Sequence, residues 1–466
     1  MSMEIGKVEK TKSLGRMDIF LGIICLVFFL DTIGPTAAMG PSVISWYLIV
    51  AAILFIPLAL VTAELGSTYP DEGGVYSWVL RGMGRKWAAR VSWFYWINNA
   101  IWLSSMTIFI IQVFAQLFLP NLSMTYIVIL SVIAIWLFVF IAMRPLKESK
   151  WITNIGALFK LLIVVGIFAS AIVYLMKNGT PANDLSLKSF TPALGASFAF
   201  FPALVFNMMG FESISSMGSQ MKNPGKDVPK AIVAAVFLLT VLYCLANLAM
   251  LVILPAEEMD IVQGLLNCFI FSWGTGGVAT IIVMVVGLIF LATLISQVPI
   301  WIVSTCTVGA EAARNGELPQ CFGKLHPKHQ SPMGGLIIYG VIASVLTIIG
   351  GLLSGSGSEL FWTLFSFTSI IFFIPYILNF NSFIKLRKND KETVRPFRFP
   401  GPDGFAFFMC RLGQAVFVFT IITFFWVPGQ PIDWAYTIPI VIGVIISVIV
   451  GEVLNRTSAK RVIEKK

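Results

Sequence analysis

Charged residues are scarce in this sequence. Only 12% of its 466 residues are Asp, Glu, Lys or Arg, whereas an average soluble protein has about 25%. Together with a hydrophobic content of 57%, this shortage excludes an ordinary soluble domain and predicts a polytopic membrane protein. Cytoplasmic loops explain the net charge of +9, so we expect contact with the lipid bilayer and no nucleic-acid partner.

The sequence also lacks the motifs of chemical catalysis. Its six cysteines have no metal-ligand spacing and are interpreted as small core residues. We find no nucleophile–base motif, phosphate-binding loop or soluble sensory domain, and therefore expect neither an enzyme nor a receptor, and no cofactor or metal. No filter-like loop or ring of charges favours a channel. We expect no cleavable signal peptide, since residues 1–16 are polar and basic and an apolar run follows directly.

Twelve apolar runs are long enough to cross a bilayer, which takes about 20 residues. They predict an all-α membrane protein with twelve transmembrane helices. The runs cover residues 17–44, 46–65, 91–119, 124–143, 151–175, 193–217, 231–254, 275–310, 334–353, 360–386, 407–427 and 434–453.

The distribution of Lys and Arg predicts the orientation. If the N-terminus is cytoplasmic, 29 of the 32 basic residues fall in inner segments and only Lys177 and Lys188 fall in outer loops. The remaining one, Lys160, lies inside a span. Because basic residues gather on the cytoplasmic side, we expect both termini there.

The first apolar run is interrupted half-way by Gly34-Pro35-Thr36-Ala37. Gly and Pro disfavour a helix interior, and in lipid a break is tolerated only where the freed backbone faces protein, water or a ligand. We predict a broken helix here, with the backbone N–H groups of Gly34, Thr36 and Ala37, at the start of the second half-helix, available to a substrate carboxylate; a mere kink is the alternative. Asp31, one turn earlier, is interpreted as a counter-ion for a substrate ammonium or a titrating group, and otherwise as a structural hydrogen-bonding residue.

A second break is predicted in the sixth run. There Phe206-Asn207-Met208-Met209-Gly210-Phe211-Glu212-Ser213 brings a glycine and polar residues to mid-span. Runs one and six hold corresponding places in two five-helix halves of opposite topology, and paired broken helices in inverted repeats indicate a transporter's binding site. We therefore divide the chain into a cytoplasmic tail (1–16), a first repeat (17–175), a second repeat (193–386), two extra helices (407–453) and a C-terminal tail (454–466).

Four stretches resemble the amino acid–polyamine–organocation (APC) transporter superfamily, and the resemblance covers nearly the whole chain. It implies a LeuT-like fold, a five-plus-five inverted repeat with broken helices one and six and two further helices. The stretches are Thr62-Ala63-Glu64-Leu65 with Pro70-Asp71-Glu72-Gly73-Gly74-Val75-Tyr76, Gly210-Phe211-Glu212-Ser213 with Lys222-Asn223-Pro224, Ala312-Ala313-Arg314-Asn315-Gly316-Glu317-Leu318-Pro319, and Arg395-Pro396-Phe397-Arg398-Phe399-Pro400-Gly401.

Within this superfamily we compare the chain with bacterial arginine/agmatine and glutamate/γ-aminobutyrate antiporters. Asn99, in a stretch that ends at Trp102, is similar to a helix-three Asn that binds guanidinium in the arginine/agmatine type. Phe206 and Trp301 fall where that antiporter has a gating Trp and a second substrate-facing Trp. The resemblance thus implies a substrate site that includes these four residues.

The helix-six backbone around Asn207 and Met208 is expected to orient the substrate. At helix one the chain departs from the family, because Gly34-Pro35-Thr36-Ala37 replaces the usual Gly-Ser-Gly type of break. This places it in a divergent branch.

Lys160 lies in helix five, where many APC members resemble this chain in carrying a Lys. The resemblance implies that its ammonium stands in for the sodium of sodium-coupled relatives, with a possible role in proton coupling; snorkelling to the interface is the alternative. Glu212 is expected to fix the inner half of helix six or to act at a gate. For Glu64 we expect inner-gate ion pairs with Arg81, Arg85 or a partner loop.

We predict a sodium-independent secondary transporter of the plasma membrane. It would be an antiporter that exchanges an amino acid or a cationic amine of the agmatine/putrescine type by alternating access. The alternative is a neutral or acidic amino-acid carrier of the glutamate/γ-aminobutyrate type, in which Asp31 is protonated or structural. The sequence leaves the substrate, the stoichiometry and the oligomeric state open.

Overall fold

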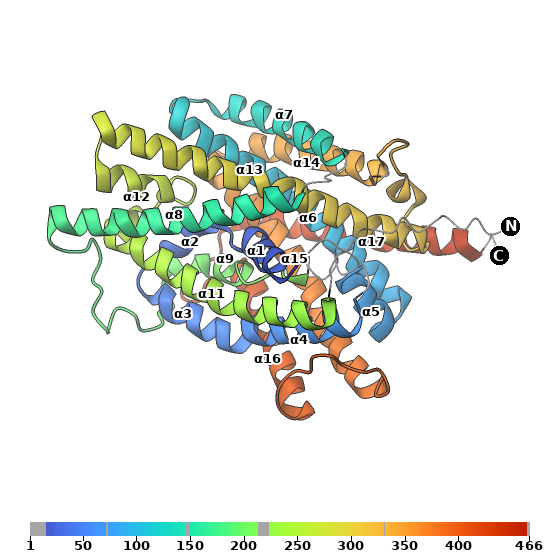
Figure 1. The fold of residues 1–466 in the computed structure, drawn as a ribbon. Helices are drawn as coiled ribbons and strands as arrows, with labels where there is room; N and C mark the ends of the chain where they lie inside the picture. The colour runs from blue at the N-terminus through green and yellow to red at the C-terminus, as the bar shows by residue number, and fades with distance from the viewer. Residues whose placement is uncertain (1–14, 71–72, 145–148, 213–222, 330, 464–466) are drawn as a thin grey trace.

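The computed structural model describes residues 15–70, 73–144, 149–212, 223–329 and 331–463, and every regular element in these ranges is helical. Most of the long helices run along one common direction in a single bundle (Figure 1). The first half holds α1 (Arg16–Val27), η1 (Leu30–Thr32), α2 (Ile33–Ala37), α3 (Ser42–Val50), η2 (Ala51–Phe55), α4 (Ile56–Thr68), α5 (Val75–Met83), α6 (Arg85–Phe118), α7 (Met124–Ala142) and α8 (Ser149–Asn178). The second half holds η3 (Ala196–Phe200), α9 (Phe201–Phe206), α11 (Pro224–Ile253), η5 (Ala256–Glu258), α12 (Gly264–Trp273), α13 (Gly277–Arg314), η6 (Gln320–Gly323), α14 (Met333–Leu353), α15 (Gly357–Asn389), α16 (Asp403–Thr423) and α17 (Trp434–Ile463).

Eleven helical stretches in the described part of the chain are long and apolar enough to cross a membrane. They correspond to eleven of the twelve predicted runs; α3, η2 and α4 form one of them, Ser42–Thr68. The sixth run is represented by the short apolar stretch Ala196–Phe206 and the chain up to Glu212. Ser213 and Lys222 of the predicted helix-six motifs, like Asp71 and Glu72, lie outside the described residues. The sixth of the twelve predicted spans and the inverted repeat therefore stay predictions.

The outer helices expose apolar side chains. On α7, Tyr126, Ile133 and Leu137 are 60%, 51% and 58% exposed, which is the pattern of a surface that faces lipid. A few ionisable side chains are buried inside the bundle, among them Lys160 and Glu212. Such residues are costly in a membrane interior and mark functional regions.

One end of the bundle gathers the ion pairs. We call it the terminal end, because α1 begins and α17 ends there. Arg16 pairs with Asp227 in the first turn of α11, and Arg90 near the start of α6 pairs with Glu452 on α17. The sequence analysis predicts that this end faces the cytoplasm. The remaining ion pairs between described residues also lie here: Arg85–Glu317, Arg314–Glu311, Arg387–Glu64, Arg387–Asp403, Arg395–Glu64 and Arg398–Asp403.

Helix one is broken, but the predicted position of the break is wrong. The helix α1 ends at Val27, and the backbone is extended at Phe28 (ψ 92°) and Phe29 (ψ 103°). Gly34 and Pro35, where we predicted the gap, lie inside α2. Proline is tolerated in the first turn of a helix, where its missing N–H would have no intrahelical partner. The Gly-Pro pair therefore accompanies the start of the second half-helix instead of forming the gap.

Candidate functional site

Lys160 on α8 holds the end of α1. Its ammonium donates hydrogen bonds to the backbone oxygens of Cys25 at 2.6 Å and Phe28 at 2.5 Å, and to Gln297 Oε1 at 2.8 Å. The last carbonyls of a helix have no intrahelical partners and carry partial negative charge, so a cation is favourable there. Because Lys160 is fully buried, the alternative that it snorkels to the interface is wrong.

Tyr243 on α11 bridges the break itself. Its hydroxyl donates to the oxygen of Val27 at 2.8 Å and accepts from the N–H of Phe29 at 2.7 Å. Trp301 on α13 donates through Nε1 to the oxygen of Leu26 at 3.3 Å. Together with the two bonds from the lysine, these contacts give each freed carbonyl of the break a side-chain donor. The unwound backbone is therefore stabilised by three separate helices.

Asp31 lies in η1, directly after the break, and is buried. Its carboxylate interacts electrostatically with Lys160. Its Oδ1 atom is buried without a hydrogen-bond partner among the described residues. A buried carboxylate needs a compensating charge, and Lys160 supplies one.

A hydrogen-bonded network joins the second part of helix one to the end of α9 and to α11. Thr32 Oγ1 donates to Asn207 Oδ1 just after α9, and Asn207 Nδ2 donates to the hydroxyl of Tyr47 at 2.8 Å. Thr36 donates to Asn247 Oδ1 on α11 at 3.0 Å. The side chains of Thr36 and Asn207 thus have protein partners in this conformation.

Gly34 allows a close approach between α2 and the loop after α11. A Cβ atom at this position would lie 2.9 Å from the backbone oxygen of Ile261 and 3.0 Å from that of Asp260. Ala37, one turn later, is buried. The contact of these backbone groups with a substrate carboxylate stays a prediction.

An aromatic pocket lies beside the break, lined by five aromatic and two amide side chains. The ring centroids of Phe29 and Phe206 are 5.1 Å apart, and those of Trp102 and Trp301 are 6.2 Å apart. Ring faces carry negative potential, so a pocket of this kind attracts organic cations. The lining consists of Phe29, Asn98, Asn99, Trp102, Phe206, Trp301 and Phe372, which come from the gap and from α6, α9, α13 and α15.

Asn98 and Asn99 supply the polar atoms of the aromatic pocket. Their Nδ2 groups donate to backbone oxygens one turn earlier on α6, at 2.7 Å from Asn98 to Tyr95 and 3.1 Å from Asn99 to Tyr95. Within the described ranges, no donor reaches the Oδ1 atom of either residue. Both oxygens are therefore free to accept from the N–H groups of a ligand.

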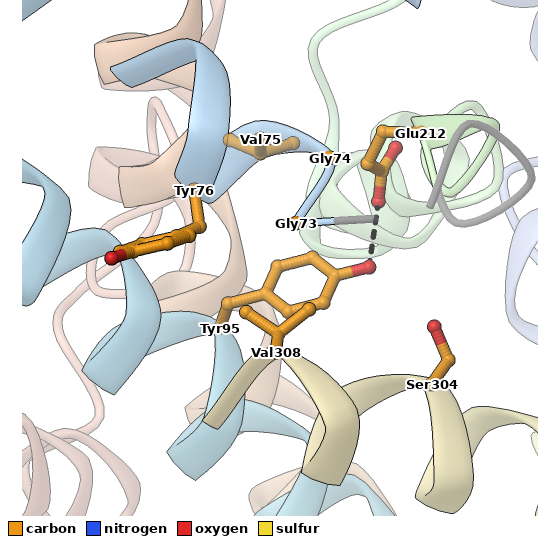
Figure 2. Close-up of a pocket in the computed structure, with 8 residues that line it drawn as sticks. All are labelled: Gly73, Gly74, Val75, Tyr76, Tyr95, Glu212, Ser304 and Val308. Carbon is orange, nitrogen blue, oxygen red and sulfur yellow. Dashed lines mark hydrogen bonds between the residues drawn. The ribbon is translucent and has the colours of Figure 1, made fainter. Parts of the chain in front are cut away.

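A second pocket is lined by Glu212 and by residues of α6, α13, α5 and the turn before α5 (Figure 2). The hydroxyls of Tyr95 and Tyr376 donate to Glu212 Oε1 at 3.1 and 2.7 Å. Ser304 on α13 faces the same space. These two bonds connect Glu212 to α6 and α15, and its predicted role in fixing the inner half of helix six stays a prediction.

Glu64 forms the centre of an ionic cluster at the terminal end. Arg387 and Arg395 both pair with its carboxylate, and the N–H of Phe399 donates to it at 2.7 Å. The side chains of Glu64 and Arg387 are each only 2% exposed. Of the predicted partners, it is the loop after α15 that pairs with Glu64, whereas Arg85 pairs with Glu317.

Tyr69 and Asp390 extend this cluster into the adjoining loops. The Tyr69 hydroxyl donates to Asp390 Oδ2 at 2.6 Å, and this bond is the main reason that the pKa of Asp390 is below its usual range. Burial, together with the adjacent carboxylate, raises the pKa of Tyr69 to about 12. The loop after α15 is thereby attached to the end of α4.

Sequence comparison identifies the family. A family model described as amino acid permease matches residues 14–449. The chain belongs to the amino acid permease family. The permease is 30% identical to the Lactococcus lactis protein named "Probable agmatine/putrescine antiporter AguD", over 93% of this chain and 92% of that protein. It is 22% identical to a glutamate/gamma-aminobutyrate antiporter of the same species, over 79% and 75%, and 25% identical to the branched-chain amino acid permease BcaP of Bacillus subtilis, over 85% of each chain. These matches confirm the predicted APC membership and indicate a multi-pass membrane protein.

The structure of the permease groups the predicted site residues in four places. The aromatic pocket brings together Asn99, Trp102, Phe206 and Trp301. Around the gap and its network lie Asp31, Gly34, Thr36, Ala37, Lys160, Asn207 and the buried Met208. Glu212 lies in the second pocket and Glu64 at the terminal end.

Four important residues of the permease were not among the predicted site residues. Phe29, Asn98 and Phe372 line the aromatic pocket, and Tyr243 bridges the break. Phe29 and Phe372 lie in apolar runs that give no signal in the sequence. The hydroxyl of Tyr243 in mid-span was a usable signal, because a polar group inside lipid requires a partner.

Proposed function

We propose that the permease is a sodium-independent antiporter of the plasma membrane that exchanges cationic amines of the agmatine/putrescine type by alternating access, with both termini in the cytoplasm. The observation that carries the proposal is the aromatic pocket, with its two amide oxygens, beside the broken helix one. A relative that matches over most of both chains is named a probable agmatine/putrescine antiporter.

The chemistry of the pocket favours a cation over an anion. A desolvated cation over an aromatic ring gains about 2 kcal/mol, and the lining offers five rings. The oxygens of Asn98 and Asn99 accept hydrogen bonds from an ammonium or a guanidinium. Among the described lining residues there is no Lys or Arg to pair with a substrate carboxylate, so an anion would lose its hydration without compensation.

Lys160 supports sodium independence. Its ammonium binds two backbone oxygens and one amide oxygen at the gap, which are the oxygen ligands that a small inorganic cation would use. A second cation at the same oxygens would be strongly repelled at short distance.

In this proposal Asp31 is a counter-ion shared between Lys160 and the incoming amine. Three observations support the role: its Oδ1 has no partner among the described residues, it interacts with Lys160, and it follows the pocket residue Phe29 by two positions. An amine that enters the pocket adds positive charge close to Lys160, and a carboxylate nearby offsets the repulsion.

The test is exchange in liposomes. The purified protein is reconstituted with radiolabelled putrescine inside, and agmatine, putrescine, tyramine, alanine or glutamate is added outside. External amines are expected to drive efflux, and Asp31→Asn is expected to slow it, whereas Asp184→Asn in an exposed loop serves as the matched control.

Three outcomes contradict parts of the proposal. Exchange driven by glutamate or alanine but not by agmatine would support the amino-acid carrier instead. Electrogenic flux without a counter-substrate would indicate a channel. If Asp31→Asn left amine exchange unchanged, the counter-ion role of Asp31 would be lost.

A further inference from the structure

A basic cavity lies at the terminal end, where α15 ends and α16 begins. Its volume is about 460 Å³, and four of the six side chains that line it are basic. Because α15 and α16 are both long and apolar enough to cross a membrane, the cavity between their ends is expected at the membrane surface. The lining consists of Arg387, Lys391, Thr393, Arg395, Arg398 and Asp403.

The cavity keeps an excess of positive charge after its ion pairs are counted. The segment 385–403 holds six basic and three acidic residues, and the buried carboxylate of Glu64 beside it reduces the net charge from +3 to +2. Arg387 and Arg395 are already committed, because every side-chain nitrogen of both has an oxygen acceptor in the protein. The remaining donors therefore belong to the other two basic side chains.

Lys391 and Arg398 carry these remaining donors. Arg398 is 62% exposed and donates only through Nη2, to Asp403 Oδ1 at 2.9 Å, so its Nη1 and Nε have no partner among the described residues. The ammonium of Lys391 is exposed and takes part in no ion pair within the described ranges. A phosphate group has several acceptor oxygens and can bind both cations at once, and the fork of an arginine matches its geometry.

From this arrangement we infer that the basic cavity binds a phosphate group. Lys391 Nζ and the free nitrogens of Arg398 donate to the phosphate oxygens. The one carboxylate of the lining, Asp403, is held by Arg387 and Arg398 through the same oxygen atom. Asp403 is also the first residue of α16, and the start of a helix favours negative charge.

The neighbouring surface favours a phospholipid headgroup as the source of the phosphate. On α16, Phe405 and Phe408 lie three residues apart on one face, and each is at least half exposed. The ammonium of Lys388 lies 5.3 Å from the ring centroid of Phe407. Exposed aromatic rings next to basic groups are typical of a surface at headgroup depth, and the terminal end is predicted to face the cytoplasmic leaflet, which is rich in anionic lipid.

The experiment measures the thermal midpoint of the purified full-length protein in detergent with three additives at constant ionic strength. The additives are short-chain phosphatidylglycerol, short-chain phosphatidylcholine, whose ammonium neutralises the same phosphate, and inorganic phosphate. A ligand that binds the folded state raises the midpoint. Phosphatidylglycerol is expected to raise it at lower concentration than phosphatidylcholine does. Lys391→Gln combined with Arg398→Gln is expected to weaken the apparent affinity for phosphatidylglycerol about tenfold or more.

Two further double variants separate loss of the site from loss of charge or of folding. Lys86→Gln with Lys230→Gln removes two exposed basic residues at the same end but outside the cavity, and is expected to leave the affinity unchanged. Lys391→Arg with Arg398→Lys keeps both charges and is expected to retain binding. Each variant is compared with its own midpoint without additive, so lower stability does not imitate weaker binding.

The outcomes distinguish the source of the phosphate and can overturn the site. If inorganic phosphate alone raises the midpoint, and Lys391 and Arg398 are required for that rise, the phosphate site stands with a soluble ligand. The site is overturned if phosphatidylglycerol acts no better than phosphatidylcholine and inorganic phosphate has no effect. It is also overturned if the affinity survives the double substitution to Gln, or falls equally in the Lys86 and Lys230 control.

Discussion

The hydroxyl of Tyr243 binds the backbone on both sides of the break in helix one. The substitution Tyr243→Phe removes this hydroxyl and no other atom. The ring stays, with its contacts to Phe28 at 4.8 Å and Tyr47 at 5.3 Å between centroids. The substitution leaves the oxygen of Val27 and the N–H of Phe29 without their partner in a fully buried region. Each unsatisfied buried group costs about 1 to 3 kcal/mol, so the free energy of unfolding is expected to fall by about 2 to 6 kcal/mol.

The assay is thermal unfolding of the purified protein together with amine exchange in liposomes. Tyr126→Phe is the matched control, because Tyr126 is 60% exposed on α7. We expect a clearly lower unfolding midpoint and slower exchange for the Tyr243 variant only. If both variants unfold at the same temperature and exchange at the wild-type rate, the hydroxyl does not stabilise the break and the reasoning is refuted.

Three further predictions concern other parts of the molecule. Replacing Na⁺ by K⁺ on both sides is expected to leave the exchange rate unchanged, because Lys160 occupies the gap; a severalfold lower rate in K⁺ would contradict this. Gly34→Ala places a Cβ atom 2.9 Å from a backbone oxygen and is expected to lower the unfolding midpoint. Gly404 has open space around it, so Gly404→Ala is expected to leave the midpoint unchanged. Equal midpoints for the two variants would argue against close packing at α2. The folded-state pKa of Asp390 is lowered below 3.8, chiefly by its bond from Tyr69, so its contribution to stability is present above about pH 4 and lost as the pH falls through the folded value. The difference in midpoint between wild type and Asp390→Asn should therefore shrink as the pH falls below about 4, and a constant difference would be contrary evidence.

The sequence predicted the features that depend on composition and spacing. Apolar runs of sufficient length foretold eleven of the spans, since a bilayer imposes that length on any helix that crosses it. Lys160 was singled out because a cation inside an apolar run needs a partner, and it caps α1. Spacing and family resemblance placed Asn99, Trp102, Phe206 and Trp301 in one site, and all four line the aromatic pocket.

The position of the break could not be predicted, because tertiary contacts decide it. Phe28 and Phe29 contain no helix breaker, yet the chain unwinds there since Lys160, Tyr243 and Trp301 satisfy its carbonyls. Those partners come from α8, α11 and α13, far away in the sequence. A Gly-Pro pair is compatible with the start of a helix as well as with a gap, so this local signal could not distinguish the two.

Phe29 and Phe372 were missed for a related reason. An aromatic residue in an apolar run looks the same whether it packs against lipid, against the core or around a pocket. Only the packing of α6, α9, α13 and α15 around the gap distinguishes these two rings from the many others.

The cluster around Glu64 has a mechanical consequence. One carboxylate serves Arg387 at the end of α15 and both Arg395 and the Phe399 N–H in the loop that follows. Moving α4 away from the end of α15 and this loop would strip these three donors from the buried carboxylate in one step, and would leave Arg387 with Asp403 as its acidic partner among the described residues. We therefore expect α4, the end of α15 and the loop to travel as one rigid unit when the protein changes the side on which its site is open, while bending is concentrated elsewhere.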